Sequence, residues 1–228
     1  MRSCSAQRRS ESNFTIMAYA VKEIFYTLQG EGANTGCAAV LCRFTGCNLW
    51  TGREQDRARA ICWFCDTDFR GTDGKSGGTY QDATELADRI AATWPLCTRK
   101  VAPFVVCTGG EPLLQLDEDL IAALHDHNFR IAVETNGTIP ALPGLDWICV
   151  SPKADADLAV RSGNELKLVY PQPEAPPERF EQLAFDHFFI QPMDGPNLEQ
   201  NTRAALAYCM AHPHWRLSLQ LHKLLGIA

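Results

Sequence analysis

Residues 102–112, APFVVCTGGEP, pass from a run of apolar residues into a turn built on two glycines and a carboxylate. Runs rich in β-branched and aromatic residues are typical of strands. An apolar run followed by a polar cluster returns at ETNG (134–137), SPK (151–153) and QPMD (191–194). Turn formation by glycine and proline would explain any one cluster. Four clusters predict a ligand-binding face at the carboxyl ends of parallel strands, where α/β folds place their sites.

The rest of the chain alternates between similar runs and helical patterns. The predicted strands cover residues 19–27, 38–44, 102–108, 129–135, 146–151, 165–170 and 186–192. Asp82, with Glu85 three residues later, is typical of a capping box and opens a helix over 83–94. A second predicted helix carries Leu120, Ile121 and Leu124. The third runs from Asn197 towards Cys209, is ended by His212-Pro213, and has a predicted stripe of Thr202, Ala205, Leu206 and Cys209. This alternation predicts a mostly parallel α/β sheet.

Length and composition limit the class of protein. The chain has 228 residues, which fits one domain with a core of its own. Its 46% hydrophobic and 21% charged residues are typical of a globular protein. A net charge of −6 argues against a broad phosphate-binding surface, so no nucleic-acid partner is expected. Because no apolar run approaches the roughly 20 residues of a spanning helix, no membrane association is expected either.

The first sixteen residues differ in character from the rest of the chain. They carry Arg2, Arg8 and Arg9 against Glu11 and lack the apolar core of a signal peptide. A strand-like segment begins directly after Met17. Residues 1–16 are therefore predicted to be a disordered leader and residues 17–228 the folded domain, in a reducing cytoplasm.

Cysteines give the clearest chemical signal. Cys62 and Cys65 are separated by two residues, and Cys47 lies fifteen positions before Cys62. A zinc site would need a fourth ligand, for which the chain offers Cys37, Cys42, Asp66 or a distant histidine. A thioredoxin-like dithiol should follow a strand and open a helix, which this segment does not. An iron–sulfur cluster with three cysteine ligands and one open iron is the third interpretation.

Two other features are given no catalytic role. The glycine-rich segment GTDGKSGG (71–78) lacks phosphate-loop spacing, since only two residues separate Gly71 from Gly74, and a flexible surface loop is predicted. Ordinary thiols are predicted at Cys4, Cys37, Cys97, Cys107, Cys149 and Cys209.

Further motifs accompany the cysteines in order along the chain. They are FYTLQGEG (25–32), CRFTGCNLW (42–50), CDTDF (65–69), CTGGEP (107–112), ETNG (134–137), SPKAD (151–155), QPMDGP (191–196) and QLHK (220–223). With the C-x14-C-x2-C spacing, this set resembles the 7-carboxy-7-deazaguanine synthase family of the radical S-adenosylmethionine (SAM) superfamily, from Met17 to Ala228. The resemblance implies a single-domain partial (β/α) barrel of mostly parallel strands with a modified cluster loop.

The same resemblance implies three cofactors: a 4Fe-4S cluster, SAM and Mg²⁺. The cluster would be held by Cys47, Cys62 and Cys65, with its fourth iron open to SAM. Thr67 would bind Mg²⁺, with Asp66 and Asp68 holding its waters. The expected SAM site has the GGE segment at the SAM amino group and comprises Phe64, Cys65, Asp66, Gly109, Gly110, Glu111, Asn136, Ser151, Pro152, Lys153, Gln191, Pro192, Met193 and Asp194.

The substrate that the resemblance implies is 6-carboxy-5,6,7,8-tetrahydropterin. Backbone amides and a carboxylate suit the guanidine-like edge of the pterin, and a planar guanidinium suits an anionic or carbonyl oxygen. The expected contacts are Leu28, Gln29, Gly30, Glu31, Arg43, Thr108, His222 and the C-terminal carboxylate of Ala228. Glu31 and His222 are also candidates for moving protons, although hydrogen bonding and positioning explain them equally well.

The implied activity is that of a carbon–nitrogen lyase: ring contraction to 7-carboxy-7-deazaguanine with loss of ammonia, in 7-deazapurine and queuosine biosynthesis. A homodimer and a flavodoxin-type reductant are implied as well. Two alternatives stay open at this point. One is another radical SAM enzyme, such as an activating enzyme, and the other is a non-catalytic zinc-binding module.

Overall fold

A computed structural model describes residues 18–95 and 101–227 of the chain. The predicted leader, Cys4, Cys97 and the terminal Ala228 lie outside the described residues. No helix in these two ranges is long and apolar enough to cross a membrane.

The described strands form one sheet in the order β3-β1-β2-β4-β5-β6-β7-β8-β9. Their bounds are β1 Tyr19–Leu28, β2 Ala38–Phe44, β3 Gly78–Tyr80, β4 Phe104–Gly109, β5 Arg130–Thr135, β6 Trp147–Val150, β7 Ser162–Tyr170, β8 Ala184–Pro192 and β9 Trp215–Leu217. Pairing is parallel from β2 through β9, whereas β1 runs antiparallel to β2 and β3. Since β3 and β9 stand at opposite edges, the described sheet is open. The prediction of a partial barrel of mostly parallel strands is confirmed.

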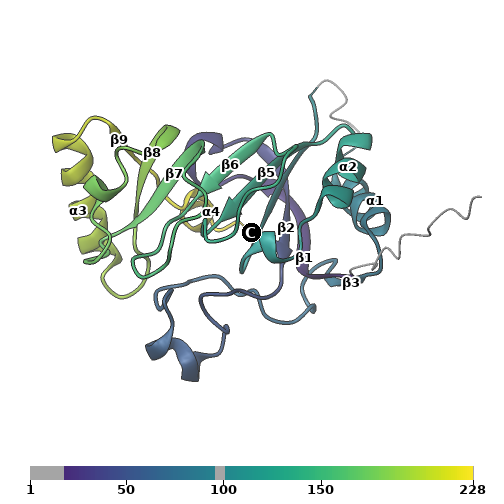
Figure 1. Cartoon of the computed structure of the whole chain (residues 1–228), viewed down its shortest axis with the longest axis horizontal. Helices are drawn as coiled ribbons and strands as arrows, with labels where there is room; N and C mark the ends of the chain where they lie inside the picture. Colours follow the sequence, from purple (N-terminus) through teal and green to yellow (C-terminus); the bar gives the residue numbers. More distant parts are fainter. Residues whose placement is uncertain (1–17, 96–100, 228) are drawn as a thin grey trace, which may run out of the picture.

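The described helices lie around this sheet, with α3 at one end, α1 and α2 at the other, and α4 near the middle (Figure 1). They are α1 Ala83–Thr93, α2 Glu118–Asp126, α3 Leu198–Ala211 and the short α4 Leu221–Leu225, and the 3-10 turns are η1 Gly32–Asn34, η2 Glu54–Arg59, η4 Pro112–Leu114 and η5 Pro177–Arg179. The predicted cap of α1 is confirmed, because the Asp82 carboxylate accepts a hydrogen bond from the Glu85 amide at 2.8 Å. Asp117 caps α2 in the same way, through the Leu120 amide.

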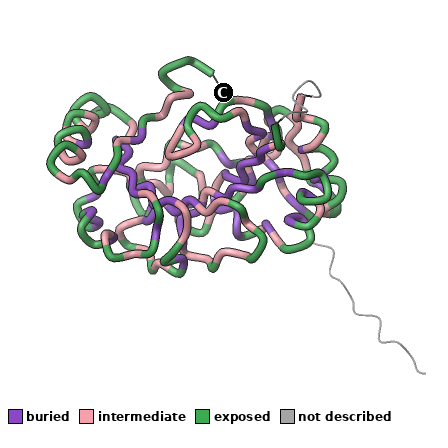
Figure 2. Tube along the Cα trace, turned by 90° about the horizontal axis from the view of Figure 1, so that it is seen from above, coloured by how far each residue is buried: buried purple, intermediate pink, exposed green. Residues whose placement is uncertain are grey.

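Buried residues follow the strands through the middle of the molecule (Figure 2). One core lies between the helices α1 and α2 and the strands β1, β2, β4 and β5, and a second lies between α3 and the strands β7 and β8. In α3 the buried residue is Ala205, with Tyr208 and Cys209 packed beside it. The prediction that Leu206 belongs to this stripe is wrong, since 47% of the residue is exposed. The helix turns Leu206 outward.

The glycine-rich segment 71–78 lies along β1. The Gly74 amide donates to the Lys22 carbonyl at 3.0 Å, and the Ile24 amide donates to the Lys75 carbonyl at 2.7 Å. A Cβ atom at Gly77 would stand 2.2 Å from the Lys22 carbonyl oxygen. The glycines thus let this segment approach the backbone of β1, which the prediction of a flexible loop did not anticipate.

Candidate active site

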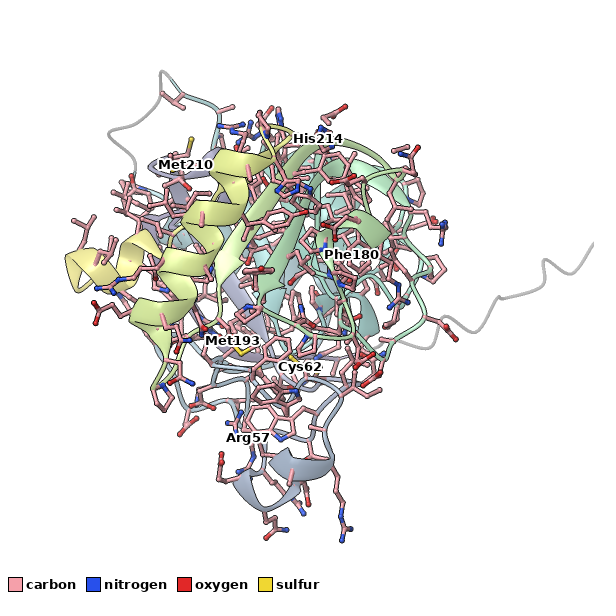
Figure 3. All side chains as sticks on the ribbon, turned by 90° about the vertical axis from the view of Figure 1, so that its left-hand side faces the viewer. Arg57, Cys62, Phe180, Met193, Met210 and His214 are labelled. Atoms are coloured by element: carbon pink, nitrogen blue, oxygen red, sulfur yellow. The ribbon has the colours of Figure 1, made fainter. Side chains whose placement is uncertain are left out.

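One pocket of about 390 Å³ opens at the carboxyl ends of the parallel strands. Its wall receives side chains from β2, β4, β5, β7 and β8 and from the loops that follow them. The long segment between β2 and β3 supplies another side. It extends below the sheet in two perpendicular views (Figures 1 and 3). Figure 3 places Cys62 where this segment meets the body of the molecule, with Arg57 farther out.

Most residues predicted for the site line this pocket. On the predicted SAM side they are Phe64, Cys65, Asp66, Gly109, Gly110, Asn136, Ser151, Lys153, Gln191, Pro192 and Asp194. On the predicted substrate side they are Leu28, Gln29, Gly30, Glu31, Arg43, Thr108 and His222. The predicted metal ligands Cys47, Cys62, Cys65 and Thr67 line it too. Segments far apart in the sequence therefore meet at one place.

Glu111 departs from the predicted arrangement because its carboxylate is fully buried behind the pocket wall. Oε1 accepts hydrogen bonds from the Leu113 amide and the Thr135 hydroxyl, and Oε2 accepts one from the Asn136 amide. Burial raises its pKa. The carboxylate ties together the loops after β4 and β5, and the GGE segment lines the pocket through Gly109 and Gly110. Pro152 and Met193 also stand outside the pocket lining.

The three cysteines face the same pocket from two points of the long segment. The Cys62 thiol hydrogen bonds to Cys65, which lowers the pKa of Cys65 and raises that of Cys62. Cys47 is half-buried, and burial raises the pKa of its thiol. A lowered thiol pKa favours the thiolate form that binds metals.

The donor set can be tested against the two metal groups considered. Within residues 18–95 and 101–227, no group of three or more His, Cys, Asp or Glu side chains converges to hold a single metal ion. A tetrahedral zinc requires such convergence, with sulfur about 2.3 Å from the metal. Cys37 is exposed and Cys42 is buried in the core, so neither completes a zinc site. A four-iron cluster binds each cysteine through a different iron, and the three cysteines that line this one cavity supply three such ligands.

Cys47, Cys62 and Cys65 lie on the long segment between β2 and β3, which we call the cluster segment. Arg57 holds this segment in shape, a role that the sequence did not predict. The Arg57 guanidinium donates to the carbonyls of Trp63 and Cys65 at 2.8 and 2.9 Å. It also stacks over the Trp50 ring, 4.1 Å from the centroid. These contacts fix the turn that presents the two sulfurs.

The GGE loop approaches the cluster segment very closely. The Glu111 amide donates to the Gly46 carbonyl at 2.9 Å. A Cβ atom at Gly110 would stand only 1.9 Å from that carbonyl oxygen. Only glycine fits at position 110 while this contact is kept.

The pocket floor carries a buried lysine between two carboxylates, which we call the floor triad (Lys167, Glu31 and Glu134). Lys167 Nζ donates to Glu31 Oε2 and, at 3.2 Å, to Glu134 Oε1. Burial disfavours the Lys167 ammonium, but Glu134 and Glu31 outweigh this effect and raise its pKa. Burial likewise opposes the Glu31 carboxylate, but Lys167 lowers its pKa. The pair therefore stays charged at neutral pH.

Other polar groups extend from this floor. The Gln29 amide and the Thr108 hydroxyl both donate to the Glu134 carboxylate, at 3.1 and 3.0 Å. Arg43 Nε is paired with Glu23 at 2.8 Å. Sequence reasoning missed Lys167 and Glu134 as site residues. A charge between Leu166 and Leu168 in an apolar strand was the available signal, because unpaired lysine is almost never fully buried.

The surroundings of Thr67 bear on the proposed magnesium site. Asp66 and Asp68 also line the pocket, but Asp66 pairs with Lys223 and Asp68 pairs with Lys22. These ion pairs do not exclude the expected role of the carboxylates in holding the waters of a cation, because a carboxylate accepts several hydrogen bonds and the Asp68 side chain stays 72% exposed.

Known proteins resemble this chain over most of its length, although no family model matches it. It is 63% identical over 211 residues to the 7-carboxy-7-deazaguanine synthase of Bordetella pertussis, covering 92% of this chain and 100% of the relative. Coverage is the same for the enzymes of that name from Bradyrhizobium diazoefficiens, at 64% identity, and Caulobacter vibrioides, at 62%.

Solved structures give a matching result. The crystal structure of QueE from Escherichia coli superposes with a TM-score of 0.67 at 26% identity, covering 94% of this chain and 100% of that one. Neither an activating enzyme nor a zinc-binding module is among these relatives. Sequence, fold and cysteine arrangement thus agree, and the chain belongs to the 7-carboxy-7-deazaguanine synthase family, the radical SAM enzymes of queuosine biosynthesis.

Proposed function

We propose that this pocket binds SAM beside a cluster held by Cys47, Cys62 and Cys65, and that it binds 6-carboxy-5,6,7,8-tetrahydropterin on the floor triad. The supporting observation is that the three thiols, the glycine loop and the floor triad all line one cavity. A reduced cluster held by these cysteines would supply the electron for cleavage of SAM, which is the radical chemistry that the reaction needs. The chain's own residues bind, orient and shield the reactants.

On the SAM side, backbone rather than carboxylate meets the amino acid part of the ligand. Gly109 and Gly110 line the pocket and have no side chain to separate a ligand from the backbone. Behind them, the Glu111 carboxylate accepts hydrogen bonds from Thr135 and Asn136. Lys153 donates to the carbonyl and hydroxyl oxygens of Ser151. The remaining assigned SAM contacts are Phe64, Asp66, Asn136, Gln191, Pro192 and Asp194.

On the substrate side, Glu31 has the right charge for the donor edge of a pterin. Lys167 lowers its pKa, so the carboxylate accepts hydrogen bonds at neutral pH. Each of its oxygens already has one partner, Lys167 or Gln220, and a carboxylate oxygen accepts more than one hydrogen bond. Positioning of the substrate therefore suits Glu31 better than donation of a proton. Arg43, Thr108, His222 and the carboxylate of Ala228 are the other proposed contacts.

The remaining assignments rest on the family resemblance. Thr67 supplies a hydroxyl ligand for Mg²⁺ next to the substrate carboxylate, since it directly follows Cys65 and Asp66 on the pocket wall. Residues 17–228 form the catalytic domain, preceded by a leader over 1–16. A flavodoxin-type protein is the proposed reductant, a homodimer the proposed assembly, and the cytoplasm the proposed location.

An anaerobic assay tests this function. Iron and inorganic sulfide are measured, then dithionite and SAM are added with and without the tetrahydropterin. Four irons per chain and pterin-dependent deazaguanine formation are expected. Cys62→Ala should lose cluster and turnover, whereas Cys37→Ala, which alters an exposed cysteine outside the pocket, should keep both. Zinc without sulfide would contradict the cluster, and SAM cleavage without pterin conversion would contradict the substrate.

Replacement of Thr67 by Ala addresses the magnesium ligand separately. Turnover should lose most of its dependence on added Mg²⁺, because one protein oxygen is removed from the cation. An unchanged magnesium titration would show that Thr67 is not a ligand.

A further inference from the structure

The pocket rim carries a second lysine between two carboxylates, which we call the rim triad (Lys223, Asp66 and Asp194). Its members come from three distant parts of the chain: α4, the cluster segment and the loop after β8. Gln220, just before α4, stands next to it. The proposed function gives no role to Gln220 or Lys223, although both line the pocket.

Lys223 uses its whole hydrogen-bonding capacity inside this arrangement. Its Nζ donates to Asp66 Oδ2 at 2.5 Å, to Asp194 Oδ2 at 2.6 Å and to Gln220 Oε1 at 2.8 Å. An ammonium group has three N–H donors, so each one is directed at a different residue. The position of Lys223 therefore fixes the two carboxylates relative to α4.

Gln220 connects the rim triad to the floor triad. Its Nε2 donates to Asp66 Oδ2 and to Glu31 Oε1, both at 3.0 Å, while its oxygen accepts from Lys223. One continuous chain of hydrogen bonds thus runs from the proposed SAM residues at the rim to the proposed pterin residues at the floor. The amide of Gln220 is the link between the two.

Backbone contacts seat this part of the chain on the pocket. The Leu221 amide donates to the Gly30 carbonyl at 2.9 Å. A Cβ atom at Gly30 would stand 2.4 Å from His222 Nδ1, so the two segments touch closely. Gln220 is therefore held in place by the chain on its carboxyl side.

We propose that Gln220 and Lys223 are positioning residues that couple the SAM subsite to the pterin subsite. This inference rests on the proposed function of the pocket. A ligand bound to Asp66 or Asp194 orders Lys223 and the amide of Gln220, and this orders Glu31 for the second ligand. The reverse order of binding has the same effect, because the coupling free energy is reciprocal. Each ligand then tightens the binding of the other.

The coupling is measurable without turnover. Cluster-reconstituted protein is titrated with SAM by calorimetry, in the absence of reductant, with and without saturating 6-carboxy-5,6,7,8-tetrahydropterin. The ratio of the two dissociation constants reports the coupling. For the unmodified chain we expect SAM to bind about fivefold or more tighter in the presence of the pterin.

Variants assign the effect to named residues. Lys223→Met should bring the ratio close to one, and Lys223→Arg should restore part of it because the cation and its donors return. Lys75→Met removes one charge from an exposed lysine outside the pocket and should keep the full ratio. Gln220→Leu removes the link without changing charge and should lose coupling as Lys223→Met does.

The outcomes separate this inference from the function beneath it. A ratio of one in the unmodified chain, or a full ratio in both Lys223→Met and Gln220→Leu, would overturn the coupling while leaving the function intact. Absence of any pterin binding, with SAM binding retained, would overturn the proposed substrate and the coupling with it. If circular dichroism shows that Lys223→Met fails to fold, Gln220→Leu and Lys223→Arg decide the question.

Discussion

The floor and rim triads repeat one arrangement at two depths. In each, a lysine stands between two carboxylates from other segments of the chain. The side chain of Lys167 is 5% exposed on the floor, whereas that of Lys223 is 38% exposed on the rim. Water can therefore replace the partners of Lys223 but has little access to the ammonium of Lys167.

This difference in burial predicts different contributions of the two triads to stability. Ion pairs near the surface contribute about 0–1 kcal/mol to stability. Removal of one member of a buried pair leaves an uncompensated charge and costs about 3–5 kcal/mol. The floor triad therefore fixes the charge and shape of the pocket, whereas the rim triad relates its loops to one another at little gain in stability.

Loss of the floor lysine should have the largest effect. In Lys167→Met, Glu31 and Glu134 face each other without a cation, and the free energy of unfolding should fall by about 3–5 kcal/mol. Urea unfolding measures this change, with Lys75→Met as the exposed control expected to stay within about 0.5 kcal/mol. Equal stability of Lys167→Met and the unmodified chain would show that the floor triad does not stabilise the fold more than the rim triad does.

A smaller loss is expected when one floor carboxylate is neutralised. Glu134→Gln keeps the size of the side chain and leaves Lys167 paired with Glu31. The free energy of unfolding should fall by about 2 kcal/mol, since a hydrogen bond to a charged group is weakened. If Glu134→Gln lost as much free energy of unfolding as Lys167→Met does, Glu134 alone would balance the charge of Lys167.

The pH dependence of stability sharpens the comparison further. The pKa of Glu31 lies below its ordinary 4.5, so its contribution is present above that value and is lost as the pH falls through the folded-state pKa. The pKa of Lys167 lies above 10.5, so its contribution is complete below that value and is lost at still higher pH. The stability difference between the unmodified chain and Glu31→Gln, which cannot titrate at this position, should be flat from about pH 6 to 9 and shrink by about 1 kcal/mol in acid. Urea unfolding across this range measures it, and a slope near pH 7 would contradict a charged pair.

The rim lysine should matter least for stability. Lys223→Met should change the free energy of unfolding by less than about 1 kcal/mol, and the change should diminish in high salt because the three side chains are each roughly one-third exposed. Urea unfolding at two salt concentrations tests both expectations. A loss equal to that of Lys167→Met would remove the distinction between floor and rim.

Local sequence signals predicted most of the fold. The runs at 19–27 and 38–44 match β1 and β2 to within a residue, because each is a long apolar run bounded by turn residues. Strands β3 and β9 have three residues each and helix α4 has five, too few to show a period. Packing against neighbours, rather than local pattern, creates these elements.

The sequence predicted which segments meet at the site, because motifs indicate them. It did not predict in which direction an individual side chain points. The spacing of Cys62 and Cys65, together with the family resemblance, predicted that the three cysteines lie close together, and all three line one pocket. The sequence placed Glu111 in the right loop but could not show that its carboxylate turns inward to three donors. Lys167 was missed because its partners come from two other segments, which only tertiary structure assembles.

The contacts of Arg57 leave the outer part of the cluster segment free to change in length. Its guanidinium holds the carbonyls of Trp63 and Cys65, while Ala58 and Arg59 remain exposed. Residues inserted at these exposed positions would raise the entropic cost of closing the loop, but this cost grows only slowly with loop length. A peptide tag or reporter could therefore be grafted beside the reactive centre without disturbing the spacing of the sulfurs, which makes this turn a natural attachment point for protein engineering.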